Sequence, residues 1–329
     1  MSERVSLISG ARGFVGAWLA KALLERGDRV VVLDPGPGSG RPSTLVLLGI
    51  AAEVVEVEAD VRDGARCAAA IADHGVERVF HLAAKTIVGE AAQNPRECFD
   101  VNVRGTWELL CAAAEHRVEA VVVASSDKAY GAHEELPYRE DFALRPTAPY
   151  EASKSAADLI ARSFWHSHRL PVAVTRFANI YGGGDTNWSR LVPEAVSAAV
   201  DGRAPVLRSD GSPIRDFLYV EDCAAAYLRL AEALLEPADG VRGEAFNAGG
   251  ERPYSVGEVV EQIAALAGTG VVAEVRGSGN PDGEIDRQYV DASRLRGLGW
   301  EPSVGLAEGL RRTVDWYAAN PAVRPPQPD

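Results

Sequence analysis

The sequence predicts an α/β fold, with a doubly wound parallel sheet followed by a smaller C-terminal α/β lobe. The chain has 329 residues, enough for one large domain or two modest ones. In its first half, short β-branched runs alternate with amphipathic stretches of helical length, which is typical of parallel strands joined by crossover helices. After Arg176 the pattern loosens into glycine-rich loops and shorter elements, and there the sequence indicates the lobe.

The expected strands and helices follow one another along the chain. β-branched residues favour strands at 5–9, 29–34, 53–57, 79–81 and 120–125. Apolar residues at helical spacing predict helices at 14–26, 65–73, 95–115, 255–267 and 306–317. A further helix follows Pro149, because proline fits the first turn of a helix. Ligands of such a sheet bind beyond the carboxyl ends of its strands.

Composition and charge exclude several classes of function. Hydrophobic residues make up 47% and charged residues 25% of the chain, as in ordinary folded proteins. The formal net charge of −13 repels phosphate backbones, so we expect no nucleic-acid partner. No run of 18 apolar residues and no signal-type N-terminus is present, so we expect no membrane partner. The four cysteines lie far apart without a C-x-x-C pair, which indicates a cytoplasmic protein and predicts no metal site.

A glycine-rich turn follows the first strand and opens the first helix. Gly10, Gly13 and Gly16 let the backbone turn tightly and approach a pyrophosphate, which the N–H groups of the helix N-terminus would bind. Phe14 and Val15 lie in the same turn. A tight turn without a ligand is the alternative interpretation. With its flanking strands, this turn is typical of a Rossmann-type dinucleotide-binding sheet.

Asp34 indicates which dinucleotide to expect. It ends the second strand 21 residues after Gly13, where a carboxylate accepts both ribose hydroxyls of an adenosine and repels a 2′-phosphate. Arg12 favours the opposite choice, because a guanidinium in the loop could reach a 2′-phosphate. We therefore expect NAD as the cofactor, with NADP less favoured.

Two further strand ends carry candidate cofactor contacts. Asp60 follows the third strand and could accept the amino hydrogen of adenine, with Val61 packed on the ring. The alternative is that Asp60 caps the next helix. The residues that end the fourth strand leave room for a cofactor against the backbone; they are Leu82, Ala83 and Ala84.

A tyrosine, a lysine and a serine form the candidate catalytic group. Tyr150 and Lys154 are four residues apart, on one face of the helix after Pro149. A free tyrosine has a pKa near ~10. The ammonium of Lys154 and a nicotinamide cation would favour the phenolate, which makes Tyr150 a base for an alcohol proton. Ser126 lies 24 residues before Tyr150, at the end of the fifth strand, and could hold the same substrate oxygen.

These motifs together resemble the extended short-chain dehydrogenases/reductases, the NAD-dependent epimerase/dehydratase family, in the branch that acts on nucleotide sugars. The resemblance runs over nearly the whole chain and includes the runs 102–106, 176–182, 190–193 and 215–222. It implies that Asn102 lies near the cofactor. It also implies that Asn179, Arg190 and Arg215 contact the sugar nucleotide, and a guanidinium matches phosphate oxygens bidentately. A local ion pair of Arg215 with Asp216 is the alternative.

The resemblance extends to further candidates for substrate binding. Glu284 and Arg287 sit where this family often contacts the base or the phosphates, although a solvated loop explains them equally well. Lys85 and Thr86, after the Ala83–Ala84 step, are candidates for contacts with the sugar.

The resemblance also sets the expected organisation of the chain. We expect residues 1–180 to form an NAD-binding Rossmann domain that carries the catalytic residues. Residues 181–322 then form mainly the sugar-nucleotide-binding lobe, from which the chain can cross back to the large sheet, and 323–329 form a frayed tail. A homodimer through the helices at 95–115 and 150–167 is implied as well.

The triplet Ser126-Asp127-Lys128 distinguishes among the reactions of this family. In 4-epimerases the two positions after the catalytic serine or threonine are usually small or neutral, whereas an acid and an amine resemble the pattern for elimination of water. Ser-Asp-Lys is similar to the Thr-Asp-Lys of CDP-glucose 4,6-dehydratases, more than to the Thr-Asp-Glu of dTDP-glucose 4,6-dehydratases. Pairing of Asp127 with Lys128 in a loop is the alternative.

The resulting hypothesis is the 4,6-dehydration of a nucleotide-diphosphate hexose, with CDP-glucose favoured. Tyr150 takes the proton of the C4 hydroxyl while the C4 hydride passes to NAD. Lys128 removes the C5 proton, and protonated Asp127 donates to the departing C6 hydroxyl before the hydride returns to C6. A nucleotide-sugar 4-epimerase and a non-catalytic NAD-binding regulatory protein are the alternatives.

Overall fold

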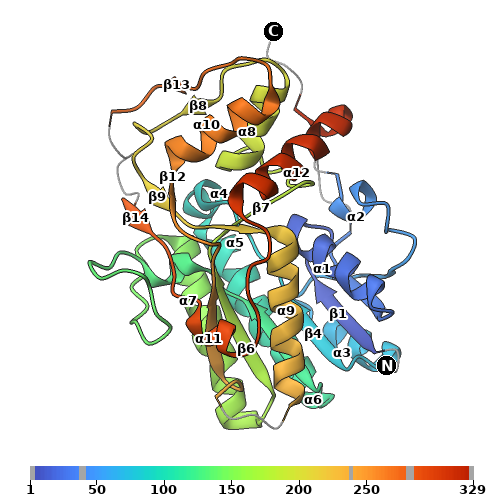
Figure 1. Ribbon diagram of the computed structural model, residues 1–329. Coiled ribbons are helices and arrows are strands. Elements are labelled where there is room, and N and C mark those ends of the chain that lie inside the picture. The colour runs from blue at the N-terminus through green and yellow to red at the C-terminus, as the bar shows by residue number, and fades with distance from the viewer. Residues whose placement is uncertain (1–3, 37–41, 237–239, 279–284, 326–329) are drawn as a thin grey trace.

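A sheet of seven parallel strands forms the centre of the molecule (Figure 1). The computed structural model describes residues 4–36, 42–236, 240–278 and 285–325. In the order in which they lie side by side, the strands are β11 Glu244–Ala248, β6 Val172–Phe177, β5 Ala120–Ala124, β4 Arg78–His81, β1 Val5–Ser9, β2 Arg29–Asp34 and β3 Val55–Glu58. The predicted parallel sheet is confirmed, and each of the five strands expected from the sequence matches an observed strand to within two residues.

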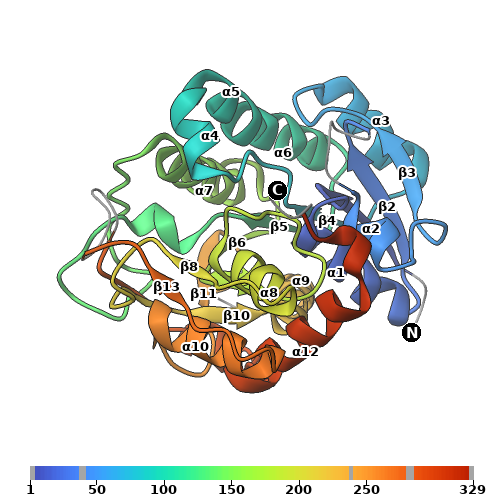
Figure 2. The ribbon, with the colours of Figure 1, turned by 90° about the horizontal axis from the view of Figure 1, so that it is seen from above.

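Helices cover both faces of this sheet, because each strand buries side chains on both sides. Leu7 of β1 belongs to the apolar core on one face and Ile8 to the core on the other. The first of these cores is covered by α3 Gly64–His74, α6 Gly105–Glu115 and α7 Pro149–His168, and the second by α1 Phe14–Glu25 and α9 Val220–Leu235. Figure 2 shows the two groups of helices on opposite sides of the sheet.

The helix predicted at 95–115 is interrupted. Its first turn is α5 Pro95–Phe99, followed by the π-helical turn η1 Asp100–Arg104, and only then by α6. A π turn holds more residues than an α turn and is frequent near functional sites. Here it carries the fully buried Asn102, whose side chain makes four polar contacts within hydrogen-bonding distance. The helical stretch expected at 95–115 is therefore confirmed, and the π turn within it is the feature that periodicity does not register.

The lobe packs around an apolar core of its own and lies above the sheet in Figure 1. Its helices are α8 Leu191–Val200, α10 Val256–Ala267 and α12 Leu306–Ala319. Short strands pair as β7 Asn179–Tyr181 with β10 Phe217–Tyr219, β8 Val206–Leu207 with β13 Glu274–Val275, and β9 Ile214–Arg215 with both β12 Tyr254–Ser255 and β14 Arg287–Gln288. The lobe meets the sheet at the carboxyl ends of its strands, where ligands of parallel sheets bind.

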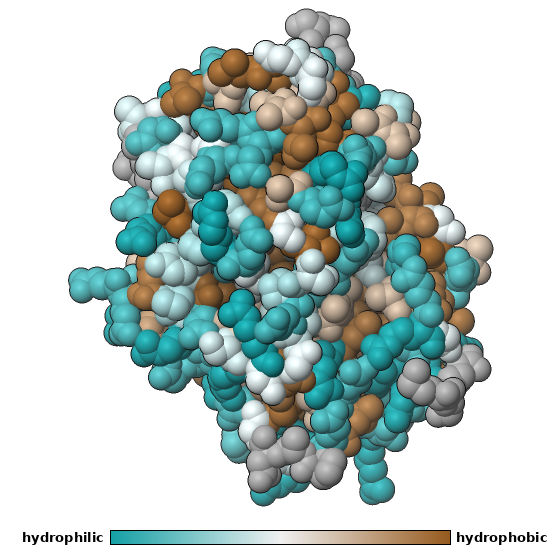
Figure 3. Space-filling view, viewed as in Figure 1, coloured by the Kyte–Doolittle hydropathy of each residue, from teal (hydrophilic) through white to brown (hydrophobic). Residues whose placement is uncertain are grey.

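The chain after residue 180 serves both layers, because α9 and β11 return to the large sheet. The division at residue 180 stays a prediction, and of the expected tail only 323–325 lie within the described residues. Figure 3 shows hydrophilic residues over much of one face, with apolar patches between them. None of the helices in the described parts of the chain is long and apolar enough to cross a bilayer.

Candidate active site

A cleft of about 1200 Å³ lies between the carboxyl ends of the large sheet and the lobe. It begins at the glycine-rich turn after β1 and passes the ends of β2, β4 and β5. Its far end is lined by α8, β8 and the segment before β9. The predicted residues that line it are Gly10, Gly13, Phe14, Val15, Gly16, Asp34, Asp60, Val61, Leu82, Ala83, Ala84, Lys85, Thr86, Ser126, Asp127, Lys128, Tyr150, Lys154, Asn179, Arg190 and Arg215.

Two glycines in the first turn are fixed by close backbone contacts. Gly10 has φ +80°, and a Cβ built on it would lie 2.7 Å from the backbone nitrogen of Ala83. A Cβ on Gly16 would lie 2.5 Å from the carbonyl oxygen of Gly10. Gly13 is the N-cap of α1, so the first free N–H groups of this helix face the cleft. A pyrophosphate can therefore approach the backbone closely at this point.

Asp34 occupies the end of β2 with its carboxylate next to the turn. Its Oδ2 accepts the backbone N–H of Arg12 at 3.0 Å, and burial raises the pKa of Asp34 to about 6. The Arg12 guanidinium does not line the cleft as predicted, because it pairs with Glu56 on the neighbouring strand β3. This pairing neutralises the cation that a 2′-phosphate would need, so these residues fit NAD rather than NADP.

Asp60 lines the cleft but is already engaged by Arg62. The guanidinium of Arg62 binds both carboxylate oxygens, at 2.9 and 2.6 Å, and holds the pKa of Asp60 below its usual value. Arg62 also reaches Asp100 at 2.8 Å. The alternative that Asp60 caps α3 is wrong, since Asp63 is the N-cap and its side chain accepts from the N–H of Arg66. Proximity in sequence does not reveal which of two neighbouring acids turns toward the helix.

Asn102 does not line the cleft, contrary to the prediction. Its amide instead holds the backbone of Lys85, with Lys85 N–H to Oδ1 at 2.7 Å and Nδ2 to the Lys85 carbonyl at 3.1 Å. Nδ2 also donates to Ser153 Oγ at 2.8 Å, which ties α7 to the segment after β4. Asn102 is therefore a support for the wall on which Lys85 and Thr86 lie.

Tyr150 and Ser126 meet in the cleft, and Lys154 lies one turn further along α7. Tyr150 and Ser126 both line the cleft, and Lys154 Nζ donates to the carbonyl of Ala124 at 2.8 Å. Burial lowers the pKa of Lys154 to about 8. Burial also raises the pKa of Tyr150 to about 12, and the charge that opposes this rise is Arg190 rather than Lys154. The predicted stabilisation of the phenolate by Lys154 and a nicotinamide cation together stays a prediction, because it concerns the enzyme with its cofactor bound.

Asp127 is a buried acid, and one of its carboxylate oxygens has no hydrogen-bond partner among the described residues. It opens the 3₁₀ turn η2 Asp127–Tyr130 after the N-cap Ser126, and 3% of the residue is exposed. Its Oδ1 accepts from Ser126 Oγ at 3.2 Å, whereas Oδ2 has no hydrogen-bond partner among the described residues. Burial raises the pKa of Asp127, with the charge of Lys128 acting in the opposite direction. No ion pair joins Asp127 to the half-buried Lys128 in the part of the chain that the structure describes.

The lobe contributes polar groups to the other wall. Asn179 Nδ2 donates to the carbonyl of Asp216 at 3.2 Å. Arg215 donates to the carbonyl of Asp286 at 3.2 Å and lines the same cleft as Asp127. Asp216 Oδ1 accepts the N–H of Gly250 at 2.8 Å.

On the wall formed by the large sheet, Lys85 Nζ pairs with Glu97 at 2.8 Å at the edge of the cleft.

One predicted substrate residue, Arg287, lies outside the cleft. Arg287 is exposed, donates to the hydroxyl of Tyr289 at 3.3 Å and does not line the cleft. Glu284 lies outside the described residues. In the β9–β14 pair Arg287 lies opposite Ile214, whereas the buried Gln288 lies opposite Arg215.

Asp185 is the residue that the sequence did not reveal. Its Oδ2 binds Arg190 Nη1 at 3.0 Å, and its side chain is 4% exposed. The two residues are five apart in a loop, a spacing that has no fixed geometry, so no local pattern indicates their contact. Among the described residues no group of three histidine, cysteine, aspartate or glutamate side chains could hold a metal ion.

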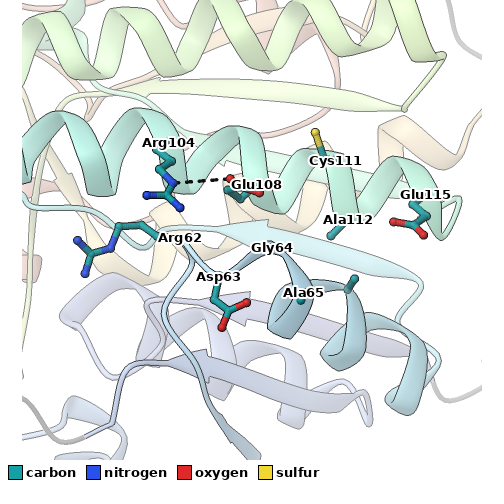
Figure 4. A pocket seen from close by; sticks show the side chains of 10 residues that line it. Arg62, Asp63, Gly64, Ala65, Arg104, Glu108, Cys111, Ala112 and Glu115 are labelled. Atoms are coloured by element: carbon teal, nitrogen blue, oxygen red, sulfur yellow. Dashed lines mark ion pairs between the residues drawn. The ribbon is translucent and has the colours of Figure 1, made fainter.

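A second, shallower groove lies between α3 and α6 (Figure 4). Its volume is about 610 Å³, and it shares Arg62 with the main cleft. Arg104 Nε lies 3.7 Å from Glu108 Oε1 along its edge. None of the described residues that line it is a candidate site residue, so the chemistry belongs to the main cleft.

Comparison with known proteins gives one consistent result. Residues 6–249 match the model of the NAD-dependent epimerase/dehydratase family. A dTDP-glucose 4,6-dehydratase of Streptomyces griseus is 35% identical, over 94% of this chain and 93% of that protein. The structure of a dTDP-glucose 4,6-dehydratase from Bacillus anthracis in complex with NAD is similar with a TM-score of 0.84 and 28% identity, over 96% and 97% of the two chains. A UDP-glucose 4-epimerase from Thermotoga maritima with UDP-glucose has a TM-score of 0.86 and 26% identity, over 96% and 99%.

Proposed function

The chain belongs to the NAD-dependent epimerase/dehydratase family, and we propose that within it the protein is a nucleotide-sugar 4,6-dehydratase. NAD is its cofactor, for which the glycine-rich turn and Asp34 form the site. The substrate is a nucleotide-diphosphate hexose, and the product is the 4-keto-6-deoxy derivative. Two dTDP-glucose 4,6-dehydratases among its relatives are 33% and 35% identical to this chain, which supports the proposal.

The observation that carries the proposal is the burial of Asp127 at the wall of the cleft, next to Ser126. Loss of water from C5 and C6 needs an acid that is protonated at neutral pH and faces the departing hydroxyl. Burial raises the pKa of Asp127, and its Oδ2 has no partner among the described residues. A 4-epimerase has no leaving group and no use for such an acid. The buried carboxyl in the cleft therefore favours dehydration.

The remaining groups divide the proton transfers among them. Tyr150, as the phenolate that the nicotinamide cation of bound NAD would favour, accepts the proton of the C4 hydroxyl, and Ser126 beside it holds the same oxygen. NAD, held by the glycine-rich turn and Asp34, would supply the hydride chemistry between C4 and C6. The C4 ketone acidifies C5, so Lys128 removes the C5 proton and Asp127 protonates the departing C6 oxygen, which leaves as water. Lys128 then returns a proton to C5, Tyr150 releases the C4 hydroxyl proton to solvent, and Asp127 regains a proton from solvent.

The proposal also specifies which nucleobase the substrate carries. The triplet Ser126-Asp127-Lys128 favours CDP-glucose, whereas the curated relatives compared above bear dTDP-glucose in their names. The holoenzyme is to be incubated with CDP-, dTDP- and UDP-glucose in deuterated water without added NADH. We expect a 4-keto-6-deoxy product with solvent deuterium at C5, formed fastest from CDP-glucose. Recovery of only the C4 epimer would establish the 4-epimerase instead, and an enzyme that binds NAD but changes no hexose nucleotide would be the non-catalytic alternative.

Asp127→Asn separates oxidation from elimination. The amide keeps the size of the side chain but has no acidic proton, so C4 oxidation continues while loss of water slows by about 100-fold. Transient absorbance of NADH should therefore build up in the variant. The control is Asp315→Asn, which removes an exposed carboxylate on α12 that pairs only with Arg311 among the described residues. Unchanged turnover of Asp127→Asn would remove the acid from the mechanism.

We also propose a homodimer formed through α5, α6 and α7. These helices lie side by side in Figure 2 and expose large apolar side chains, which are Phe99, Trp107 and Leu159. Burial of such side chains favours association. Light scattering is expected to give twice the chain mass, and Leu159→Lys should shift it toward the monomer.

We propose a cytoplasmic location for the enzyme. Its four cysteines are free, and Cys67, Cys98 and Cys223 are buried as thiols, which suits a reducing compartment. Fractionation of cells that produce the protein tests this location.

A further inference from the structure

The loop at 182–187 is held from the side of the large sheet by two helices. Trp18 of α1 donates its Nε1–H to the carbonyl of Gly183 at 2.8 Å. Thr44, which opens the short helix α2 Thr44–Leu47, donates its hydroxyl to the carbonyl of Gly184 at 3.0 Å. Both carbonyls are thereby fixed by residues that lie about 140 positions or more away in the chain. The loop has no regular structure of its own, so these bonds set its course.

From the other side, α12 closes onto the same loop. The ring of Trp316 lies so close to Gly183 that a Cβ there would be 2.4 Å from Trp316 Cγ. The fully buried Tyr317 donates its hydroxyl to the carbonyl of Asp185. The loop is therefore clamped between α1 and α2 on one side and the C-terminal helix of the lobe on the other.

Asp185 links this loop to Arg190, which lines the cleft. Its Oδ1 accepts the N–H of Asn187 at 3.0 Å, and its Oδ2 binds Arg190 Nη1 at 3.0 Å. The Asp185 side chain is 4% exposed, whereas that of Arg190 is 38% exposed and lines the cleft. A buried carboxylate depends strongly on its charged partner, because a lone charge in such a site is costly. The Asp185 carboxylate is therefore buried and held in place, whereas the Arg190 guanidinium is accessible from the cleft.

We propose that Asp185 is a positioning residue for the substrate, through which α12 fixes the guanidinium of Arg190 in the cleft for the diphosphate of the sugar nucleotide. The inference rests on the proposed function only for the identity of the anion. A flexible arginine loses side-chain entropy when it binds phosphate, and a guanidinium that is already held loses less. Arg190 also opposes the rise in the pKa of Tyr150 that burial causes. A fixed guanidinium thus serves both the anion and the catalytic tyrosine.

A double-mutant cycle separates this role from simple support of the loop. Asp185→Asn keeps an oxygen for the N–H of Asn187 but removes the charge that holds Arg190. Binding of CDP, UDP and dTDP to the NAD-loaded enzyme is measured by calorimetry in four proteins: the parent, Asp185→Asn, Arg190→Met and the double variant. We expect Asp185→Asn to weaken nucleoside-diphosphate binding about tenfold when Arg190 is present, and by less than about twofold in the Arg190→Met background.

The cycle has outcomes that overturn the proposal. Equal weakening by Asp185→Asn in both backgrounds means that Asp185 only supports the loop, and no weakening in either means that Arg190 needs no positioning. Tyr317→Phe, which removes only the hydroxyl on the Asp185 carbonyl, should give a smaller loss of binding that also depends on Arg190. Asp315→Asn on the same helix is the control and should leave binding unchanged. Because the measurement is binding, a protein that binds nucleoside diphosphates but dehydrates no sugar would refute the proposed function and leave this inference standing.

Discussion

The two loops that enclose the cleft are held in different ways. The glycine-rich turn at 10–16 is held mainly through its main chain: Gly13 N–H bonds the carbonyl of Gly10 at 3.2 Å, and the Arg12 carbonyl accepts the N–H of Thr44 at 2.9 Å. The loop at 182–187 is fixed by side chains from distant elements, above all Trp18 and Tyr317. The cofactor side thus depends on main-chain contacts and glycine conformation, and the substrate side on side-chain contacts.

This difference teaches where each site tolerates change. A turn that depends on glycine conformation fails when a single Cβ is added, whatever the rest of the fold does. A loop clamped by distant side chains keeps its backbone but shifts by small amounts when one of them is lost. Changes in the first loop should therefore remove cofactor binding, and changes around the second should weaken substrate binding alone.

The largest effect is expected for Gly10→Ala. The new Cβ would overlap the backbone of Ala83 at 2.7 Å with φ at +80°, so we expect a loss of about 3 kcal/mol in the free energy of unfolding and no NAD binding. Gly27→Ala is the matched control, because Gly27 has φ +82° with no atom within 4 Å of its Cβ. It should cost about 1 kcal/mol and leave NAD affinity unchanged. Chemical denaturation and NAD titration measure both, and equal losses for the two variants would contradict steric overlap as the cause.

A second test uses the charge of Asp34. Asp34→Asn should weaken NAD binding about tenfold, because a charged acceptor for the ribose hydroxyls is lost. The same variant should melt higher than the parent above pH 7 without NAD. Burial raises the pKa of Asp34 from 3.8 to about 6, so the folded parent binds more protons between these values and loses stability as pH rises through this window. The advantage of the variant should shrink as pH falls from 6 toward 4, and an advantage independent of pH would rule out this carboxylate as its origin.

The smallest effect is expected on the substrate side. Trp316→Ala removes the ring that packs on Gly183 and should raise KM for the sugar nucleotide about fivefold by loosening the 182–187 loop, with NAD affinity unchanged. Trp316→Phe keeps an aromatic ring and should restore most of the affinity. Parallel loss of NAD and substrate binding in Trp316→Ala would mean that the two loops are not independently held.

Much of the fold and the cofactor side could be predicted from the sequence, because periodicity and glycine spacing are local signals. The parallel sheet and its helices follow from them. The π turn at Asp100–Arg104 could not be predicted, since it depends on Asn102 reaching Lys85 from another element. The sequence also could not predict that Arg62 binds Asp60, or that burial raises the pKa of Tyr150. Side-chain pairing and desolvation arise only when elements pack.

By itself the sequence determined that the strands are parallel, that a tight glycine turn opens the first helix, and that an acid ends the second strand. These features depend on backbone conformations available within a few residues. Only the tertiary structure decided that Arg12 turns to Glu56 and that Asp185 holds Arg190 under α12. The physical reason is that these contacts join residues whose separation is set by how helices and strands dock, and docking is fixed by the whole core rather than by any one segment.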